Sequence, residues 1–256
     1  MPTNISHLPY AETGYFSTLI KDYLAGNAAL RDFYRFTPDL EGIDAAIGER
    51  KNFPVDRKLL ADTLRQQYRG LEHTEATRHN LERLEQDNSF TICTAHQPNL
   101  ATGYLYFIYK IVHAIKLAEI LNTRHPGKHF IPVYYMGGED NDLAELGTFH
   151  YGEQKFTWHA DGQQGAVGRM STKSLKPLLH DLFRLLGPPG SNTDALIQLL
   201  TEAYLHHETI ATATQYLVHQ LFGRYGLLVL DPDEPGFKKA MLPVLRDDLL
   251  HQNSFR

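Results

Sequence analysis

The chain has 256 residues, of which 42% are hydrophobic and 21% are charged, and its formal net charge is −5. These values are typical of a soluble globular protein with one large domain or two small ones, and they exclude the basic field that nucleic-acid binding requires. The longest apolar stretch, Tyr104 to Val112, contains Lys110 and is too short to span a bilayer. With one cysteine and no signal peptide, the sequence predicts a cytoplasmic protein without membrane or nucleic-acid partners.

The first third of the chain predicts helices. Apolar residues recur at helical spacing over residues 13–36, and Gly26-Asn27 is expected to end the first helix. A longer helix or a helix pair is predicted over residues 56–87. We therefore expect residues 1–87 to form an N-terminal helical segment that packs on the core.

The middle of the chain predicts an α/β core with a parallel sheet. Two β-prone runs, 89–95 and 129–137, flank a helical pattern over 103–122, which together make a βαβ unit. The apolar run 226–231 suits a third strand buried on both faces. Between them lie a predicted hairpin at 148–160 and helices at 174–186, 192–207 and 209–224. The predicted core is residues 88–256, with an insertion at about 148–225.

The end of the chain predicts an amphipathic helix after Asp231-Pro232 that stops without a compact finish. Three strands also make a thin parallel sheet. We interpret the chain as the front part of a longer protein, with a core that is incomplete at its C-terminus.

Polar clusters follow all three predicted strands, at residues 95–103, 137–146 and 231–236. In an open parallel sheet, ligands bind outside the carboxyl ends of the strands. The three loops are distant in sequence but are predicted to be adjacent in space, which indicates a single ligand site.

The first loop combines an imidazole with two amides. His96 suits acid–base work near neutral pH, and Gln97 and Asn99 offer donors and acceptors. A helix that opens at Thr102 or Gly103 would direct its positive end at a phosphate or carboxylate, and Tyr106 and Lys110 lie one turn apart on it. Helix capping by His96 and Asn99, and a solvated Lys110, are the structural alternatives.

The second loop concentrates acids at a strand end: Glu139, Asp140 and Asp142, with Asn141 among them. Such a group suits an ammonium, sugar hydroxyls or Mg²⁺, or the deprotonation of an attacking amine. Helix capping by Asp140 or Asp142 is the alternative, and one of them is expected to cap. Asp231 and Asp233 in the third loop carry a weaker signal, because Asp-Pro is common turn chemistry.

Several standard motifs are missing from the sequence. It has neither phosphate-loop fingerprint, no H-E-x-x-H and no G-x-S-x-G elbow. Cys93 lies in a predicted buried strand, so we expect it to pack in the core rather than to react. We predict no metal site of the protein's own.

Three segments carry a family resemblance: "HQPNLATGYLYFIYKIVHAIKLAEILN", "PVYYMGGEDNDLAELG" and "YGLLVLDPDEPGFKKAMLPVLRDDL". They resemble the bacillithiol biosynthesis cysteine-adding enzymes, a family of cysteine ligases, and the likeness covers nearly the whole chain. Its first motif is matched here by Gln97, Leu100, Gly103, Leu105, Tyr106 and Lys110. Its second motif, similar to Glu-Asp-His-Asp, is matched by Glu139, Asp140 and Asp142.

The resemblance implies a Rossmann-like core related to class I adenylating ligases, with ATP as the suspected cofactor. It implies that cysteine is joined to the amine of glucosaminyl-malate, which completes bacillithiol. It also implies a chain about twice this long, with a C-terminal coiled coil that is absent here, and a homodimer of the full-length protein. The expected catalytic residues are His96, Asp140 and Asp142; the expected binding residues are Gln97, Asn99, Gly103, Tyr106, Lys110, Glu139, Asn141 and Asp231.

The sequence departs from the family pattern at both motifs. His96 and Pro98 stand where the family has Gly and a second Gln, and Asn141 stands where the second motif has His. If that His is the family's general base, His96 is the nearby candidate to replace it.

Two alternatives stay open: a nucleotidyltransferase of the same superfamily acting on another small substrate, and a truncated, inactive ligand-binding scaffold. Residues 169–174, "RMSTKS", are similar to a class I synthetase loop. They precede the third strand instead of following the last one, so we interpret this similarity as coincidence.

Overall fold

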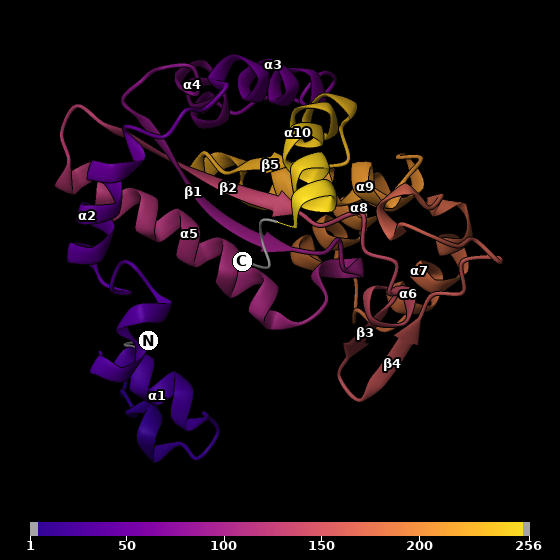
Figure 1. Cartoon of the computed structure of the whole chain (residues 1–256). Helices are drawn as coiled ribbons and strands as arrows, with labels where there is room; N and C mark the ends of the chain where they lie inside the picture. Colours follow the sequence, from indigo (N-terminus) through magenta and orange to yellow (C-terminus); the bar gives the residue numbers. More distant parts are fainter. Residues whose placement is uncertain (1–4, 253–256) are drawn as a thin grey trace. The chain divides into compact units, whose positions relative to one another are not determined.

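The computed structural model describes residues 5–252, and the chain divides into two compact units, Met1–Val55 and Asp56–Arg256 (Figure 1). The sequence-based division at residue 87 falls inside the second unit. The reason is that the helices over 56–87 share their apolar residues with the sheet that follows them.

Over its described residues, 5–55, the first unit contains two α-helices, α1 (Thr18–Leu24) and α2 (Leu40–Arg50). The helix α1 ends just before Gly26, whose φ of 70° is left-handed, as the sequence predicts. The helix α2 was not predicted. Its start is fixed by Asp39, whose carboxylate accepts a 2.7 Å hydrogen bond from the backbone of Gly42.

The second unit is built on a parallel sheet of three strands in the order β1-β2-β5. The strands β1 (Ser89–His96) and β2 (His129–Met136) pair along their whole length, and α5 (Leu105–Arg124) makes the crossover between them. The strand β5 (Leu228–Leu230) pairs only with Val133–Tyr135 of β2. The predicted α/β core with a parallel sheet is confirmed.

Helices cover both faces of this sheet. Because side chains alternate along a strand, Ile131 and Val133 of β2 face α3 (Arg57–Gln67) and α4 (Glu75–Arg83). Tyr134 and Met136 face α5 and α9 (Ile210–Phe222) instead. Figure 1 shows α3 and α4 on the opposite side of the strands from α5.

The segment between β2 and β5 forms its own apolar cluster. It begins with the short helix α6 (Leu143–Leu146) and the predicted hairpin, β3 (Thr148–Tyr151) and β4 (Gln154–Thr157). The helices α7 (Lys176–Phe183) and α8 (Ser191–Leu205) follow, and the core they share includes Trp158 and Tyr204. After β5 the chain continues as α10 (Pro235–His251), none of whose residues is buried. None of the described helices combines the length and apolarity needed to cross a membrane.

Side chains complete the hydrogen bonding along the β5 side of the sheet. The amide of Val229 donates to the hydroxyl of Tyr68 at 2.7 Å. Just beyond β5, the side chain of Gln67 binds both backbone groups of Asp231, at 3.1 and 2.7 Å. In the first half of β2, which β5 does not reach, Asn122 binds both backbone groups of Phe130, each at 2.9 Å. Each amide side chain supplies the donor and the acceptor that a neighbouring strand would supply.

The other edge of the sheet corrects one prediction. Within residues 5–252, β1 has a strand neighbour only in β2. The side chains of Thr91, Cys93 and Ala95 are exposed, because α3 and α4 pack over β2 and β5 instead of β1. The expectation that Cys93 packs in the core is therefore wrong.

Replacing Asn122 tests the side-chain completion of β2. Asn122→Leu keeps the size of the side chain but leaves the N–H and C=O of Phe130 without partners. We expect the free energy of unfolding to fall by about 1–2 kcal/mol, measured by urea denaturation. The control Asn192→Leu changes an exposed helical asparagine and should have a smaller effect. Equal losses in the two variants would contradict this account.

Candidate functional site

Four chain segments meet at the carboxyl ends of the strands. Three are the predicted loops after β1, β2 and β5. The fourth is a 3₁₀ turn, Val167–Arg169, which was not predicted to reach the site. The amides of Val167 and Gly168 donate 2.8 Å hydrogen bonds to the carbonyls of Asp140 and Gly138. The insertion between β2 and β5 therefore contributes to this edge of the sheet.

The first loop is held by its backbone. The hydroxyl of Tyr134, buried in β2, donates to the carbonyls of His96 and Gln97, at 2.9 and 3.2 Å. The amide of Gly137 also donates to the carbonyl of His96 at 2.9 Å. The positions of His96 and Gln97 are thus set by the neighbouring strand.

His96 lies at the end of β1, where its side chain is largely buried. Its ring centroid is 5.0 Å from that of Tyr106 and 5.4 Å from that of Phe107, both in the first turn of α5. Burial, and secondarily the charge of Lys110, lower the pKa of the imidazole. His96 is therefore neutral near pH 7 and able to accept a proton.

Asn99 is a buried amide without a partner. Its side chain is 1% exposed, and neither its Nδ2 nor its Oδ1 makes a hydrogen bond. Gly103 packs against it so closely that a Cβ at residue 103 would lie 2.7 Å from the Cβ of Asn99. Buried amides are normally hydrogen-bonded, and here the nearest polar group is the imidazole of His96, whose pKa the Asn99 side chain raises against the effect of burial. The alternative that Asn99 caps the helix with its side chain is wrong, because it makes no cap hydrogen bond.

The turn that follows has a strained backbone. Ala101, Thr102 and Gly103 have φ angles of 49°, 71° and 57°, all in the left-handed region. Two of them are not glycine, and such residues cost on the order of 1–3 kcal/mol each. The amide of Ala101 is held by the hydroxyl of the buried Tyr204 at 2.9 Å. Strain of this kind persists where the surroundings enforce it, which occurs most often at functional sites.

The turn leads into the N-terminus of α5, which no side chain caps. The amide of Phe107 in the first turn of this 20-residue helix donates to the carbonyl of Tyr104 at 3.0 Å, which leaves the amides of Leu105 and Tyr106 to an anion. Tyr106 stacks on Tyr104 with ring centroids 5.7 Å apart. Lys110 reaches back to the end of β1, where its Nζ donates to the carbonyl of Ala95 at 3.2 Å. Its charge therefore lies near the first loop while its side chain stays exposed to solvent, so its binding role stays a prediction.

The second loop joins the first through one hydrogen bond. The Nε2 of Gln97 donates to the Oδ2 of Asp140 at 3.1 Å. The other oxygen of Asp140 accepts from the amide of Asp142 at 2.9 Å. These two bonds lower the pKa of Asp140, so it is a carboxylate at neutral pH. Asp142 caps α6 by accepting from the amide of Glu145 at 3.0 Å, which confirms that one of the acids is a cap. Asn141 between them is exposed.

The third loop contains a network of charges. The carboxylate of Asp233 binds both Arg169, with 2.6 Å between Oδ1 and Nη2, and Lys238. Lys238 also binds Glu139 at 2.8 Å, which ties the second loop to the third. These cations hold the pKa of Asp233 at about 2. Burial raises the pKa of Asp231, whose Oδ1 accepts from the amide of Asp233 at 3.0 Å.

Sequence reasoning missed Arg169 and Lys238 as members of this site. Arg169 opens the segment "RMSTKS" that we set aside as coincidence, and Lys238 lies on α10, where nothing in the spacing distinguishes it from its neighbours. The other predicted residues all lie on the loops after the strands or in the first two turns of α5. Their roles stay predictions. Within residues 5–252, no group of three or more His, Cys, Asp or Glu side chains is arranged to hold a metal ion.

Fold and loops together define a Rossmann-like α/β domain with polar and charged side chains gathered at the carboxyl edge of a parallel sheet. The model of the family "Bacillithiol biosynthesis BshC, N-terminal Rossmann-like domain" matches residues 3–256. The chain belongs to this family.

Curated relatives give the same assignment. The chain is 41% identical over 257 residues to a Flavobacterium psychrophilum protein named "Putative cysteine ligase BshC", covering 99% of this chain and 48% of the relative. Proteins of the same name from Cytophaga hutchinsonii and Salinibacter ruber are 36% and 30% identical, covering 97% and 94% of this chain. The chain spans about half the length of these relatives.

The lowered pKa of His96 predicts a pH dependence of stability. Below the ordinary histidine pKa of 6.5, His96 binds a proton in the unfolded chain but stays neutral in the folded protein. Stability therefore decreases as the pH is lowered, until the pH falls below the folded-state pKa. We expect His96→Gln to reduce the loss of unfolding free energy between about pH 7.5 and about pH 5, measured by urea denaturation. His113→Gln, at an exposed position of α5, should leave the loss unchanged. A wild-type pH slope in His96→Gln would refute this.

The ion pairs of Asp233 predict a loss of stability in the same direction, but at a lower pH. The Asp233 side chain is 13% exposed. Its ion pairs, which lower its pKa, stabilise the folded state at pH values above 3.8, the ordinary pKa, and this stabilisation is lost as the pH falls through about 2. Asp233→Asn should lower the free energy of unfolding near pH 7 by about 1–2 kcal/mol. The difference from wild type should shrink in the acid limb of a pH titration followed by circular dichroism. A difference that stays constant down to that limb would exclude the ion pairs as its source.

Proposed function

We propose that this domain belongs to a ligase that joins the carboxyl group of cysteine to the amine of glucosaminyl-malate in bacillithiol biosynthesis. The hydrogen bond between Gln97 and Asp140 carries the proposal. It couples the two family motifs and brings an anionic carboxylate beside the loop that holds a neutral His96. A base and a fixed negative charge at one edge are what an amine nucleophile requires.

The roles of the residues follow from their charge states. Asp140 is the group that receives the ammonium form of the sugar amine, because its carboxylate is ionised and partly accessible. His96 accepts one proton from this ammonium, which frees the nitrogen lone pair to attack the activated carbonyl carbon, and the second proton is released to solvent as the amide forms. The nitrogen–carbon bond forms, the carbon–oxygen bond to the leaving group breaks, and the leaving group departs with the electron pair.

An anion site at the start of α5 supports a role for ATP. The uncapped helix N-terminus, the nearby Lys110 and the unpartnered amide of Asn99 fit a phosphate group or a malate carboxylate. ATP would supply the leaving group that activates the carboxyl of cysteine. The charge network of Arg169, Lys238 and Asp233 borders the same edge and offers cations for further phosphate oxygens.

The test is reconstitution with glucosaminyl-malate, cysteine and ATP, followed by mass spectrometry of the coupled thiol. It compares this chain alone with the same chain extended by the second half of the Flavobacterium psychrophilum relative. Coupled product from either form supports the ligase. If pyrophosphate is released only with a different small substrate, the protein is a nucleotidyltransferase. If the substrates bind but are not converted, it is a ligand-binding scaffold. Either outcome would reject the ligase.

In the active form, His96→Ala and Asp140→Asn should each reduce kcat by about 10²–10⁴-fold, with the far-UV circular dichroism of the wild type. The controls His113→Ala and Asp194→Asn change exposed residues away from this edge and should retain activity. Near wild-type turnover in both site variants would refute these roles.

A further inference from the structure

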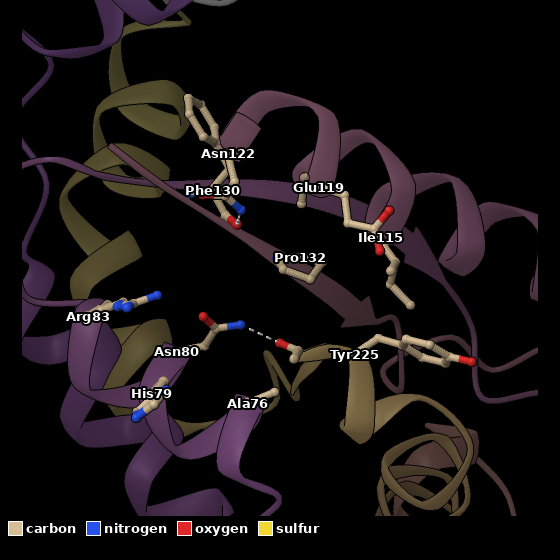
Figure 2. Close-up of a pocket in the computed structure, with 12 residues that line it drawn as sticks. Ala76, His79, Asn80, Arg83, Ile115, Glu119, Asn122, Phe130, Pro132 and Tyr225 are labelled. Carbon is tan, nitrogen blue, oxygen red and sulfur yellow. Dashed lines mark hydrogen bonds between the residues drawn. The ribbon is translucent and has the colours of Figure 1, made fainter. Parts of the chain in front are cut away.

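A cavity of about 260 Å³ lies at the amino ends of the strands, at the other end of the sheet from the candidate site (Figure 2). It opens to solvent and is lined by α4, the second half of α5, the start of β2 and the turn before β5. Pockets for drug-sized ligands measure about 300–1,000 Å³. Because this cavity is smaller than that range, it suits a ligand smaller than a drug-sized molecule.

The cavity exists because β5 is short. It pairs with β2 only from Val133 onward, so the first half of β2 has no strand on this side. Asn122 already satisfies both backbone groups of Phe130, and Pro132 has no N–H to satisfy. This wall therefore presents no backbone N–H of Phe130 or Pro132 that needs a further partner, and the charged groups of the cavity come from side chains.

One wall carries an unpaired positive charge. Arg83 of α4 is half-buried and extends towards β2 in Figure 2, and its guanidinium makes no hydrogen bond or ion pair with the described residues. Burial and the charge of Arg83 lower the pKa of the nearby His129, so that imidazole stays neutral near pH 7. The charge of Arg83 therefore remains available to an anion such as a carboxylate.

Asn80 and Glu119 supply acceptors in the lining, which also contains His79 and Tyr225. Asn80 donates its Nδ2 to the carbonyl of Gly226 at 2.7 Å, which leaves its Oδ1 as an acceptor. Glu119 of α5 pairs one oxygen with Lys116 at 2.7 Å and retains the other. Figure 2 shows Asn80 and Arg83 on the α4 side and Glu119 on the α5 side, with Pro132 of β2 between them. A ligand here would meet the guanidinium of Arg83 and the amide oxygen of Asn80 on the α4 side. On the α5 side it would meet the carboxylate of Glu119, which can accept from a positive group.

The lining between these groups is apolar. Ile115 and Ala118 of α5 are 7% and 2% exposed, and Phe130 and Pro132 of β2 are buried with them. A short aliphatic side chain would fit against this surface.

We propose that this cavity binds a free α-amino acid with a small apolar side chain. The carboxylate would bind Arg83, the ammonium would bind Glu119 and the Oδ1 of Asn80, and the side chain would lie on Ile115 and Pro132. This site is separate from the proposed catalytic edge and goes beyond the ligase function.

The test uses L-valine and two matched analogues that each lack one charge, 3-methylbutanoate and isobutylamine. Binding is followed on the whole chain by isothermal titration calorimetry and by amide chemical shifts. We expect saturable shifts of Asn80, Asn122 and Gly226 with L-valine, and affinity for each analogue at least about tenfold weaker. Arg83→Gln and Glu119→Gln should each weaken L-valine binding by about tenfold or more. Arg78→Gln, an exposed arginine of α4 outside the cavity, should bind as the wild type does.

Three results would overturn the proposal: equal binding of L-valine and 3-methylbutanoate, shifts confined to other residues, or no saturable shift up to the solubility limit. The readout is binding alone, so failure here and failure of the ligase reaction are distinguishable.

Discussion

The hydrogen-bond requirement of an open parallel sheet determines much of this domain. A strand at an edge leaves every second N–H and C=O without a strand partner, and three strands provide two such edges. Along β5 and the first half of β2 the missing partners are the hydroxyl of Tyr68 and the amides of Gln67 and Asn122. These bonds also position function. Gln67 fixes the backbone of Asp231 at the candidate site, and Asn122 finishes one wall of the cavity.

The candidate site is organised around fixed backbone rather than around mobile side chains. Tyr134 holds the carbonyls of the first loop, and Tyr204 holds the strained turn. They place stabilising contacts beside the strained turn and the buried amide of Asn99, which are themselves costly to strain or bury. A site assembled in advance loses less free energy on binding, because little has to be ordered when the ligand arrives.

Sequence reasoning identified the features that depend on periodicity and on strand ends. The βαβ unit, the hairpin and the third strand were predictable, since apolar patterns and turn residues mark them locally. The convergence of His96, Gln97 and Asp140 followed from the rule for parallel sheets. The contributions of Arg169 and Lys238 were not predictable, because they depend on how the insertion and α10 fold back onto the edge. The exposure of Cys93 depends in turn on where α3 and α4 lie over the sheet, and an apolar run cannot show that.

The uncovered face of β1 has a practical consequence. Cys93 is the single cysteine of the chain and is exposed, and it precedes His96 by three positions. A maleimide fluorophore or nitroxide attached there would be unique without prior mutagenesis and would report on ligand arrival at the neighbouring loop. Partial burial of the sulfur raises the pKa of the Cys93 thiol. Conjugation should therefore proceed faster in mildly alkaline buffer than at neutral pH, because the thiolate is the reactive form.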